Sequence, residues 1–137
     1  MYGSVIKSQQ FLQDGMWDSL PSATKTKYLT DAARIIDRLN YYSQKKISTQ
    51  ALQFPRTNET IVPVDIEEAA YFIALELAMG FDEEKNAQAI TNIQVGKASR
   101  GRPRRPDYLV AGVPSYRAWQ LLFKYLRTPS VSLERIS

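Results

Sequence analysis

The chain has 137 residues, which is enough for one domain with a buried core. It has no cysteine and no histidine, which excludes disulfides, thiolate or histidine metal sites and Ser-His-Asp catalysis. No apolar run approaches the roughly 18 residues that a membrane helix needs, and the N-terminus lacks the apolar core of a signal peptide. We therefore expect a soluble intracellular protein that has no catalytic residues, binds no metal and uses no cofactor.

The first clear helical pattern runs from about Pro21 to Tyr42. Its apolar residues recur at helical spacing and share one face: Leu29, Ala32, Ala33, Ile36 and Leu39. Ser22, directly after Pro21, is suited to cap the start of this helix. Upstream, apolar residues between Phe11 and Leu20 predict a short amphipathic helix that packs on this one.

The periodicity stops between Tyr41 and Pro63, in a polar stretch with two prolines. A connection of this length is usually held by apolar anchors, for which the sequence offers Leu52, Phe54, Ile61 and Val62. We expect Phe54 to reach the core and Arg56 to point outward, where a neighbouring subunit's carboxylate could pair with it. An unpaired surface arginine is the alternative. Phe54 and Arg56 are thus the predicted subunit-interface residues.

A second helix is predicted from about Asp65, where Asp65 and Glu68 resemble a capping box, to a stop at Gly80. It is apolar on nearly all sides, which is typical of a central, buried helix. The polar segment from Asp82 to Val95 is compatible with helix or strand.

The positive charge is concentrated in an arm at about residues 95–113. Five basic residues lie in this arm, and no acidic residue lies among them before Pro106: Lys97, Arg100, Arg102, Arg104 and Arg105. Without these five charges the formal net charge of the chain would be −1 instead of +4. Gly101, Pro103 and Pro106 disfavour a helix, so we expect a mobile loop or hairpin that meets phosphate or acidic protein. A merely solvated charge run is the alternative.

A third helix is predicted from Ser115, as its cap, to Leu126, with Pro129 ending it. A short tail, residues 128–137, follows. The fold class is therefore all-α: a small bundle of three main helices and a short N-terminal helix, with the basic arm between the second and third main helices. One domain spans residues 1–137, with its helical core at about 16–81 and 115–127. The predicted core residues are Ala32, Ala33, Ile36, Leu39, Ala70, Ile73, Leu77, Trp119, Leu122 and Phe123.

Three groups of residues suggest chemistry. Asp82, Glu83 and Glu84 could form a metal or acid–base site, but adjacent carboxylates at a helix end usually face solvent. The run from Arg100 to Arg104 matches the core of an AT-hook, whose extended backbone enters the minor groove. In the long connection, aromatic side chains beside basic ones could stack on nucleic-acid bases, or they could seal an edge of the core. The residues concerned are Tyr41, Tyr42, Phe54, Lys45, Lys46 and Arg56.

A longer pattern covers residues 16–81. It consists of Trp17–Leu20, Ala32–Asp37, Gln50–Arg56, Val62–Pro63 and Leu75–Ala78. This pattern resembles the head–tail adaptor (head-completion or connector) proteins of tailed bacteriophages, in which a helix leads to a Gln-x-Leu-Gln-Phe-Pro-Arg turn and a second helix. Related sequences are labelled DnaT-like single-strand-binding proteins.

The resemblance implies a structural virion protein at the head–tail junction, present in the host cytoplasm during assembly. Its copies would form a homo-oligomeric ring, usually a dodecamer, which docks on the portal protein after DNA packaging and joins it to a tail or nozzle protein. Genomic DNA would pass through the lumen. From charge alone, the arm of Lys97, Arg100, Arg102, Arg104 and Arg105 would contact the portal or that DNA. The alternative is a DNA-binding module, either single-strand-binding or AT-hook-like.

Overall fold

The computed structural model describes residues 1–96 and 106–127, and for residues 91–96 it describes the backbone only. In these ranges the secondary structure is helical, with two isolated β-bridges, which confirms the all-α class. Two short helices, α1 (Val5–Leu12) and α2 (Gly15–Asp18), stand where the sequence predicted one short N-terminal helix. No described helix is long and apolar enough to cross a membrane.

The N-terminal helices are fixed by side-chain caps and by one buried indole. The carboxylate of Asp14 accepts from the Trp17 backbone N–H at 3.0 Å and starts α2. Trp17 is fully buried, and its Nε1–H donates to Ser8 Oγ at 3.0 Å. This hydrogen bond satisfies the one polar atom of the indole ring and ties α2 to α1.

The helix α3 (Ser22–Asp37) buries the predicted apolar face, and it differs from the prediction at its start. Pro21 is its N-cap, and Ser22 is the first helical residue rather than the cap. Lys25 is buried on this helix, and its Nζ donates to the Asp18 carbonyl at 3.1 Å. That carbonyl belongs to the last turn of α2, where a cation is favourable.

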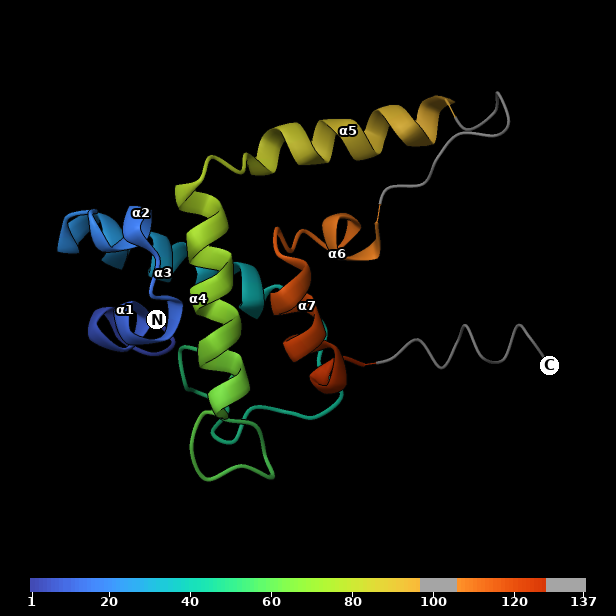
Figure 1. The fold of residues 1–137 in the computed structure, drawn as a ribbon. Coiled ribbons are helices and arrows are strands. Elements are labelled where there is room, and N and C mark those ends of the chain that lie inside the picture. The colour runs from blue at the N-terminus through green and yellow to red at the C-terminus, as the bar shows by residue number, and fades with distance from the viewer. Residues whose placement is uncertain (97–105, 128–137) are drawn as a thin grey trace.

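The helix α4 (Val64–Ala78) is the centre of the bundle, as its composition predicted. Figure 1 shows it between α1 and α7, with α3 crossing behind it. Pro63 is its N-cap without a side-chain hydrogen bond, so the predicted capping box of Asp65 and Glu68 is wrong. Gly80 follows the helix with a φ of +107°, which glycine adopts readily and which supports the predicted stop.

The segment with no clear periodicity forms α5 (Glu83–Gly96), which extends from the top of α4 and runs above α6 (Figure 1). The described part of the predicted arm contains a further short helix, α6 (Asp107–Val110), which the sequence did not predict. Ser115 caps α7 (Tyr116–Leu122) by accepting from the Ala118 N–H at 3.2 Å, as predicted. A 3₁₀ turn, η1 (Phe123–Tyr125), replaces the last turn of the predicted third helix.

The core confirms six of the ten predicted residues as buried: Ala32, Ala33, Ile36, Ala70, Ile73 and Leu122. Leu39, Leu77 and Trp119 are partly buried against it. Phe123 was also predicted in the core, but it is 45% exposed. Tyr2 lies in the core and was not predicted there, since a terminal residue has no periodic neighbours to indicate its burial.

Candidate functional site

The five basic arm residues predicted to contact portal or DNA lie outside the described residues, as do the arginines of the AT-hook-like run. The structure therefore places only the two ends of the segment that carries them. One end is the last turn of α5, and the other is Pro106 at the start of α6. Figure 1 shows that the described end of α5 lies well away from α4 and α3.

Phe54 anchors the long connection to the core, as predicted. It is 2% exposed and makes edge-to-face contacts with the rings of Tyr2, Tyr41 and Tyr125 at centroid distances of 6.1, 4.8 and 5.6 Å. These rings come from three distant parts of the chain. The core residue Phe54 therefore joins the N-terminus, the long connection and the end of η1.

The prediction that Arg56 points outward is wrong. Arg56 is 6% exposed, its Nε donates to Ser43 Oγ at 3.2 Å, and its Nη1 donates to the Gln53 side-chain oxygen at 2.5 Å. Its guanidinium also lies 5.3 Å from the centre of the Tyr41 ring. The cation thus holds the connection together within one chain. A role for Phe54 and Arg56 at a subunit interface stays a prediction.

A second buried network binds the N-terminus to the connection. The Tyr2 hydroxyl donates to Asp37 Oδ1 at 2.5 Å and accepts from the Phe54 N–H at 3.1 Å. Asp37 also accepts from the Gln53 N–H at 3.3 Å. Desolvation outweighs these hydrogen bonds and raises the pKa of Asp37 above its ordinary value. Burial likewise raises the pKa of Tyr2, so its hydroxyl remains a donor at neutral pH.

The base-stacking hypothesis for the long connection fails at its main rings. Tyr41 and Phe54 are buried, and the Tyr41 hydroxyl donates to the Ile36 carbonyl at 2.6 Å. Tyr42, at 64% exposure, is the ring of this set that nucleic acid could reach. The same residues seal a core edge, which was the alternative.

The carboxylates at the start of α5 serve the fold. Asp82 accepts from the backbone N–H groups of Glu84 and Lys85 at 2.9 and 3.1 Å and so caps the helix. Glu83 pairs with Arg34 at 2.9 Å and with Arg38 at 2.7 Å. Within residues 1–96 and 106–127, no group of three candidate ligands could hold a metal ion.

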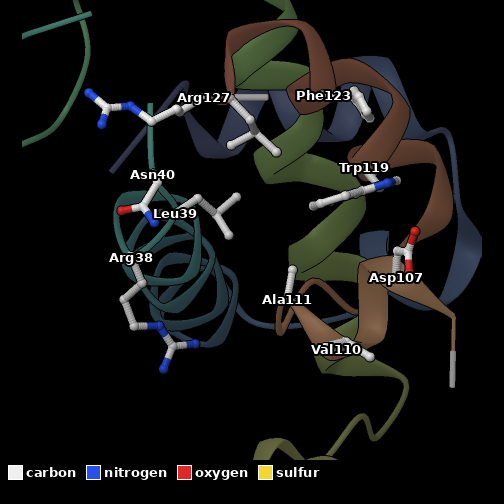
Figure 2. Close-up of a pocket in the computed structure, with 10 residues that line it drawn as sticks. Arg38, Leu39, Asn40, Asp107, Val110, Ala111, Trp119, Phe123 and Arg127 are labelled. Carbon is white, nitrogen blue, oxygen red and sulfur yellow. The ribbon is translucent and has the colours of Figure 1, made fainter. Parts of the chain in front are cut away.

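The structure contains an open groove of about 480 Å³, which we term the α6–α7 groove. It lies between the end of α3 and the two helices α6 and α7, as Figure 2 shows. Leu39 borders it on one side, and Trp119 and Ala111 border it on the other. The full lining is Arg38, Leu39, Asn40, Asp107, Val110, Ala111, Trp119, Phe123, Leu126 and Arg127.

The charges around the α6–α7 groove nearly balance. The Arg38 guanidinium is paired with Glu83, and Asp107 brings a carboxylate to the groove wall. Figure 2 shows the guanidinium groups of Arg38 and Arg127 directed away from the hollow. The groove therefore offers apolar surface rather than a built anion site. Sequence reasoning missed it because residues 107–111 were assigned to the arm and Phe123 to the core.

Comparisons with known proteins give one result. The model of the family described as "Putative DnaT-like ssDNA binding protein" matches residues 2–99, which is more than half of the chain. No curated protein and no solved structure was found to match. The matched range ends before α6 and α7, so it includes α3 but leaves out most of the lining of the α6–α7 groove. The resemblance to DnaT-like sequences is confirmed, while the resemblance to head–tail adaptors stays a prediction.

Proposed function

The chain belongs to the family of putative DnaT-like ssDNA-binding proteins, and we propose that it is a structural head–tail adaptor of a tailed phage. In this proposal its copies form a ring, of the dodecameric kind usual among adaptors, which docks on the portal protein after DNA packaging. The ring joins the portal to a tail or nozzle protein, and DNA passes through its lumen. The protein would work in the virion and assemble in the host cytoplasm.

The observation that carries the proposal is the division of the molecule into a closed bundle and an extension. The bundle is filled by the apolar side chains of α4 and sealed by Phe54, which is 2% exposed. The extension is α5, which takes the chain away from α3 and α4 before the basic segment begins (Figure 1). A ring subunit needs such a rigid body for its position and an extension for reaching its neighbours.

The residues that carry the resemblance to adaptors support the same function. Gln50 holds its own turn by donating from Nε2 to the carbonyls of Leu52 and Pro55 at 2.8 and 2.9 Å. Phe54 and Arg56 then fix this turn to the core. These side chains hold the turn and the core together, which fits the subunit of a scaffold.

The arm supplies the contact to portal or DNA in this proposal. Its five positive charges, from Lys97, Arg100, Arg102, Arg104 and Arg105, would form one annulus in a ring of copies. Such a charge density needs acidic protein or phosphate beside it. We favour the portal, because a strongly basic lumen would retain DNA by counterion release and slow its ejection.

The test combines the purified chain with DNA-free rings of the portal protein encoded in the same genome. The proposal predicts a complex with one adaptor ring per portal, visible by electron microscopy and by sedimentation. Replacing Arg100, Arg102, Arg104 and Arg105 with serine should abolish docking if the arm binds the portal. If docking survives and only DNA retention or ejection changes, the arm acts on DNA in the channel. Absence of any portal complex with the wild-type chain contradicts the adaptor function.

A second candidate function is single-strand DNA binding, which the family match favours. The charge distribution limits where such binding could occur. The matched residues 2–99 carry ten basic and twelve acidic side chains, whereas residues 100–127 carry seven basic and one acidic. DNA binding would therefore depend on the arm and on α6–α7, and an AT-hook-like mode would use the arm alone.

The two candidates separate in a titration of the isolated chain with single-stranded oligothymidine and with A·T-rich duplex. A single-strand-binding protein should prefer oligothymidine, with an affinity that falls steeply as salt rises. An AT-hook should prefer the duplex. An adaptor should bind both weakly and without preference, and should bind the portal instead.

A further inference from the structure

The helix α5 is held to the molecule differently from the other long helices. α3 and α4 bury apolar side chains in the core, among them Leu29 and Ile73. The side chains of α5 are described as far as Ile90, and within this part the one that is buried is polar, Asn86. Most helices in proteins depend on an apolar face for their stability. The attachment of α5 therefore depends mainly on polar contacts.

Two polar contacts hold the first turns of α5, and we term them together the α5 clasp. The Glu83 carboxylate accepts from Arg34 Nη2 at 2.9 Å and from Arg38 Nη2 at 2.7 Å, which ties α5 to α3. Asn86 Nδ2 donates to the Leu109 carbonyl at 2.8 Å, which ties α5 to α6. Glu83 and Asn86 are three residues apart and so lie on the same side of the helix.

The ion pairs of the α5 clasp are open to solvent. The side chains of Arg34 and Arg38 are each 51% exposed, and that of Glu83 is 34% exposed. Dissolved salt screens such pairs, since the Debye length falls from about 8 Å at physiological ionic strength to about 3 Å at 1 M. The apolar contact of α3 with α4 does not depend on charge. Salt should therefore loosen α5 while the core stays intact.

The link between α4 and α5 is suited to act as a pivot. At the end of α4, the Phe81 N–H donates to the Glu76 carbonyl at 3.1 Å and closes that helix. At the start of α5, the Asp82 carboxylate accepts from the N–H groups of Glu84 and Lys85. Each helix thus has its own cap, and the joint between Phe81 and Asp82 belongs to neither. Figure 1 shows this short link between the two helices.

We propose that α5 is a hinged helix, which the α5 clasp holds against α3 and α6 and which pivots at Phe81–Asp82 when the ion pairs of Glu83 are weakened. The inference goes beyond the proposed function, because it concerns the chain alone and applies to an adaptor and to a DNA-binding protein alike. α5 ends at Gly96, directly before the first of the five basic residues of the arm. The position of α5 therefore sets where this basic run begins.

The test measures the distance between α3 and α5 by double electron–electron resonance. The chain has no cysteine, so spin labels at Ala23→Cys on α3 and Gln88→Cys on α5 would be the only two. Both positions are exposed and lie outside the α5 clasp. At about 20 mM salt the distance distribution should be narrow. At about 1 M salt it should broaden, with the displaced population about two- to fivefold larger, as the loss of partly exposed ion pairs implies.

Glu83→Gln in the labelled chain removes the charge that salt would screen. This variant should show at low salt the broad distribution that the wild-type residue gives at high salt, and added salt should change it little further. Replacing Arg34 and Arg38 together with glutamine should have the same effect from the other side of the pairs. Circular dichroism should retain the wild-type helical signal, since a pivot moves α5 without unfolding it.

Asp65→Asn is the matched control. Asp65 forms an ion pair with Lys124, also at partly exposed side chains, but it lies in the first turn of α4, at the opposite end from α5. This variant should keep the narrow distribution at low salt and the wild-type response to added salt.

Two results overturn the inference. One is a narrow distribution that neither about 1 M salt nor Glu83→Gln changes, which would mean that the α5 clasp does not hold the helix. The other is broadening that is accompanied by a loss of helical signal, which would mean that α5 unfolds instead of pivoting. Portal docking and oligothymidine binding are measured separately, so failure of either function leaves the result for the hinge unchanged.

Discussion

Two regions of the molecule differ in how completely the chain covers its apolar side chains. In the long connection, Phe54 and Arg56 are buried in a network that reaches Tyr2 and Tyr41. At the other side of the molecule, Phe123 and Val110 lie half exposed along an open groove beside α6 and α7. The first region is complete within one chain, whereas the second presents surface that one chain does not cover. This contrast distinguishes residues that hold the fold from residues that are available to partners.

The largest effect should come from truncating the two phenylalanines that represent these regions. Phe54→Ala should lower the free energy of unfolding by about 3–5 kcal/mol, because it opens a cavity among three aromatic rings. Phe123→Ala should lower it by about 1 kcal/mol or less, because the ring is already half exposed. Urea denaturation of the two variants at low concentration measures the difference. Equal losses would remove the distinction between the two regions.

The sequence predicted the first region better than the second. The apolar spacing around Ile36 and Ile73 identified the core faces of α3 and α4, since burial on one helix face leaves a periodic record. It did not identify Arg56 as buried, because its partners Ser43 and Gln53 are brought together by an irregular turn with no sequence period. The same limit hid Lys25, which is buried only because α2 ends beside it.

The groove was harder to predict because the spacing along one helix does not show how far its apolar face is covered. The spacing of Trp119, Leu122 and Phe123 is that of one apolar face. In the structure Leu122 is buried, Trp119 is half-buried and Phe123 is 45% exposed. No periodic pattern within the short segment 106–111 indicated that α6 would form the opposite wall.

A second prediction tests whether Arg56 is structural. Arg56→Leu keeps much of the side-chain volume but leaves the Ser43 hydroxyl and the Gln53 side chain without their donor. The free energy of unfolding should fall by about 1–3 kcal/mol, because polar groups that are partly shielded from water lose their hydrogen-bond partner. Thermal and urea denaturation give this value. A change within about 0.5 kcal/mol would mean that the guanidinium contributes little and that Arg56 is available for another role.

A smaller effect is expected at the ion pairs between α3 and α5. Glu83→Gln removes the charge that pairs with Arg34 and Arg38, and the stability should fall by about 0.5–1 kcal/mol, since these side chains are partly solvated. Desolvation opposes ionisation of Glu83, but the two arginines outweigh it and lower its pKa. The contribution of Glu83 is therefore present at neutral pH and is lost as the pH falls through this lowered pKa. Wild-type and variant stabilities that differ equally at neutral and acidic pH would contradict the ion-pair assignment.

The smallest effect concerns the pH dependence of the buried network. Asp37 has a raised pKa, so the folded chain binds its proton more tightly than the unfolded chain does. Acidification through that pKa should therefore add stability from this group, in the opposite direction to Glu83. Asp37→Asn cannot titrate, and the wild-type chain should gain stability relative to it as the pH falls. A relative loss on acidification would mean that the hydrogen bonds to Tyr2 and Gln53 outweigh burial.

The most direct test of the adaptor account is amide hydrogen exchange of the chain alone and bound to DNA-free portal rings. In the isolated chain, the amides of α3 and α4 should exchange slowly and those of α5 and α6 quickly, because the latter helices have few packing contacts. On the portal, α5, α6 and α7 should become protected while α3 and α4 change little. Exchange in α5–α7 that is the same with and without portal would contradict the account, and protection by oligothymidine instead would favour the single-strand-binding function.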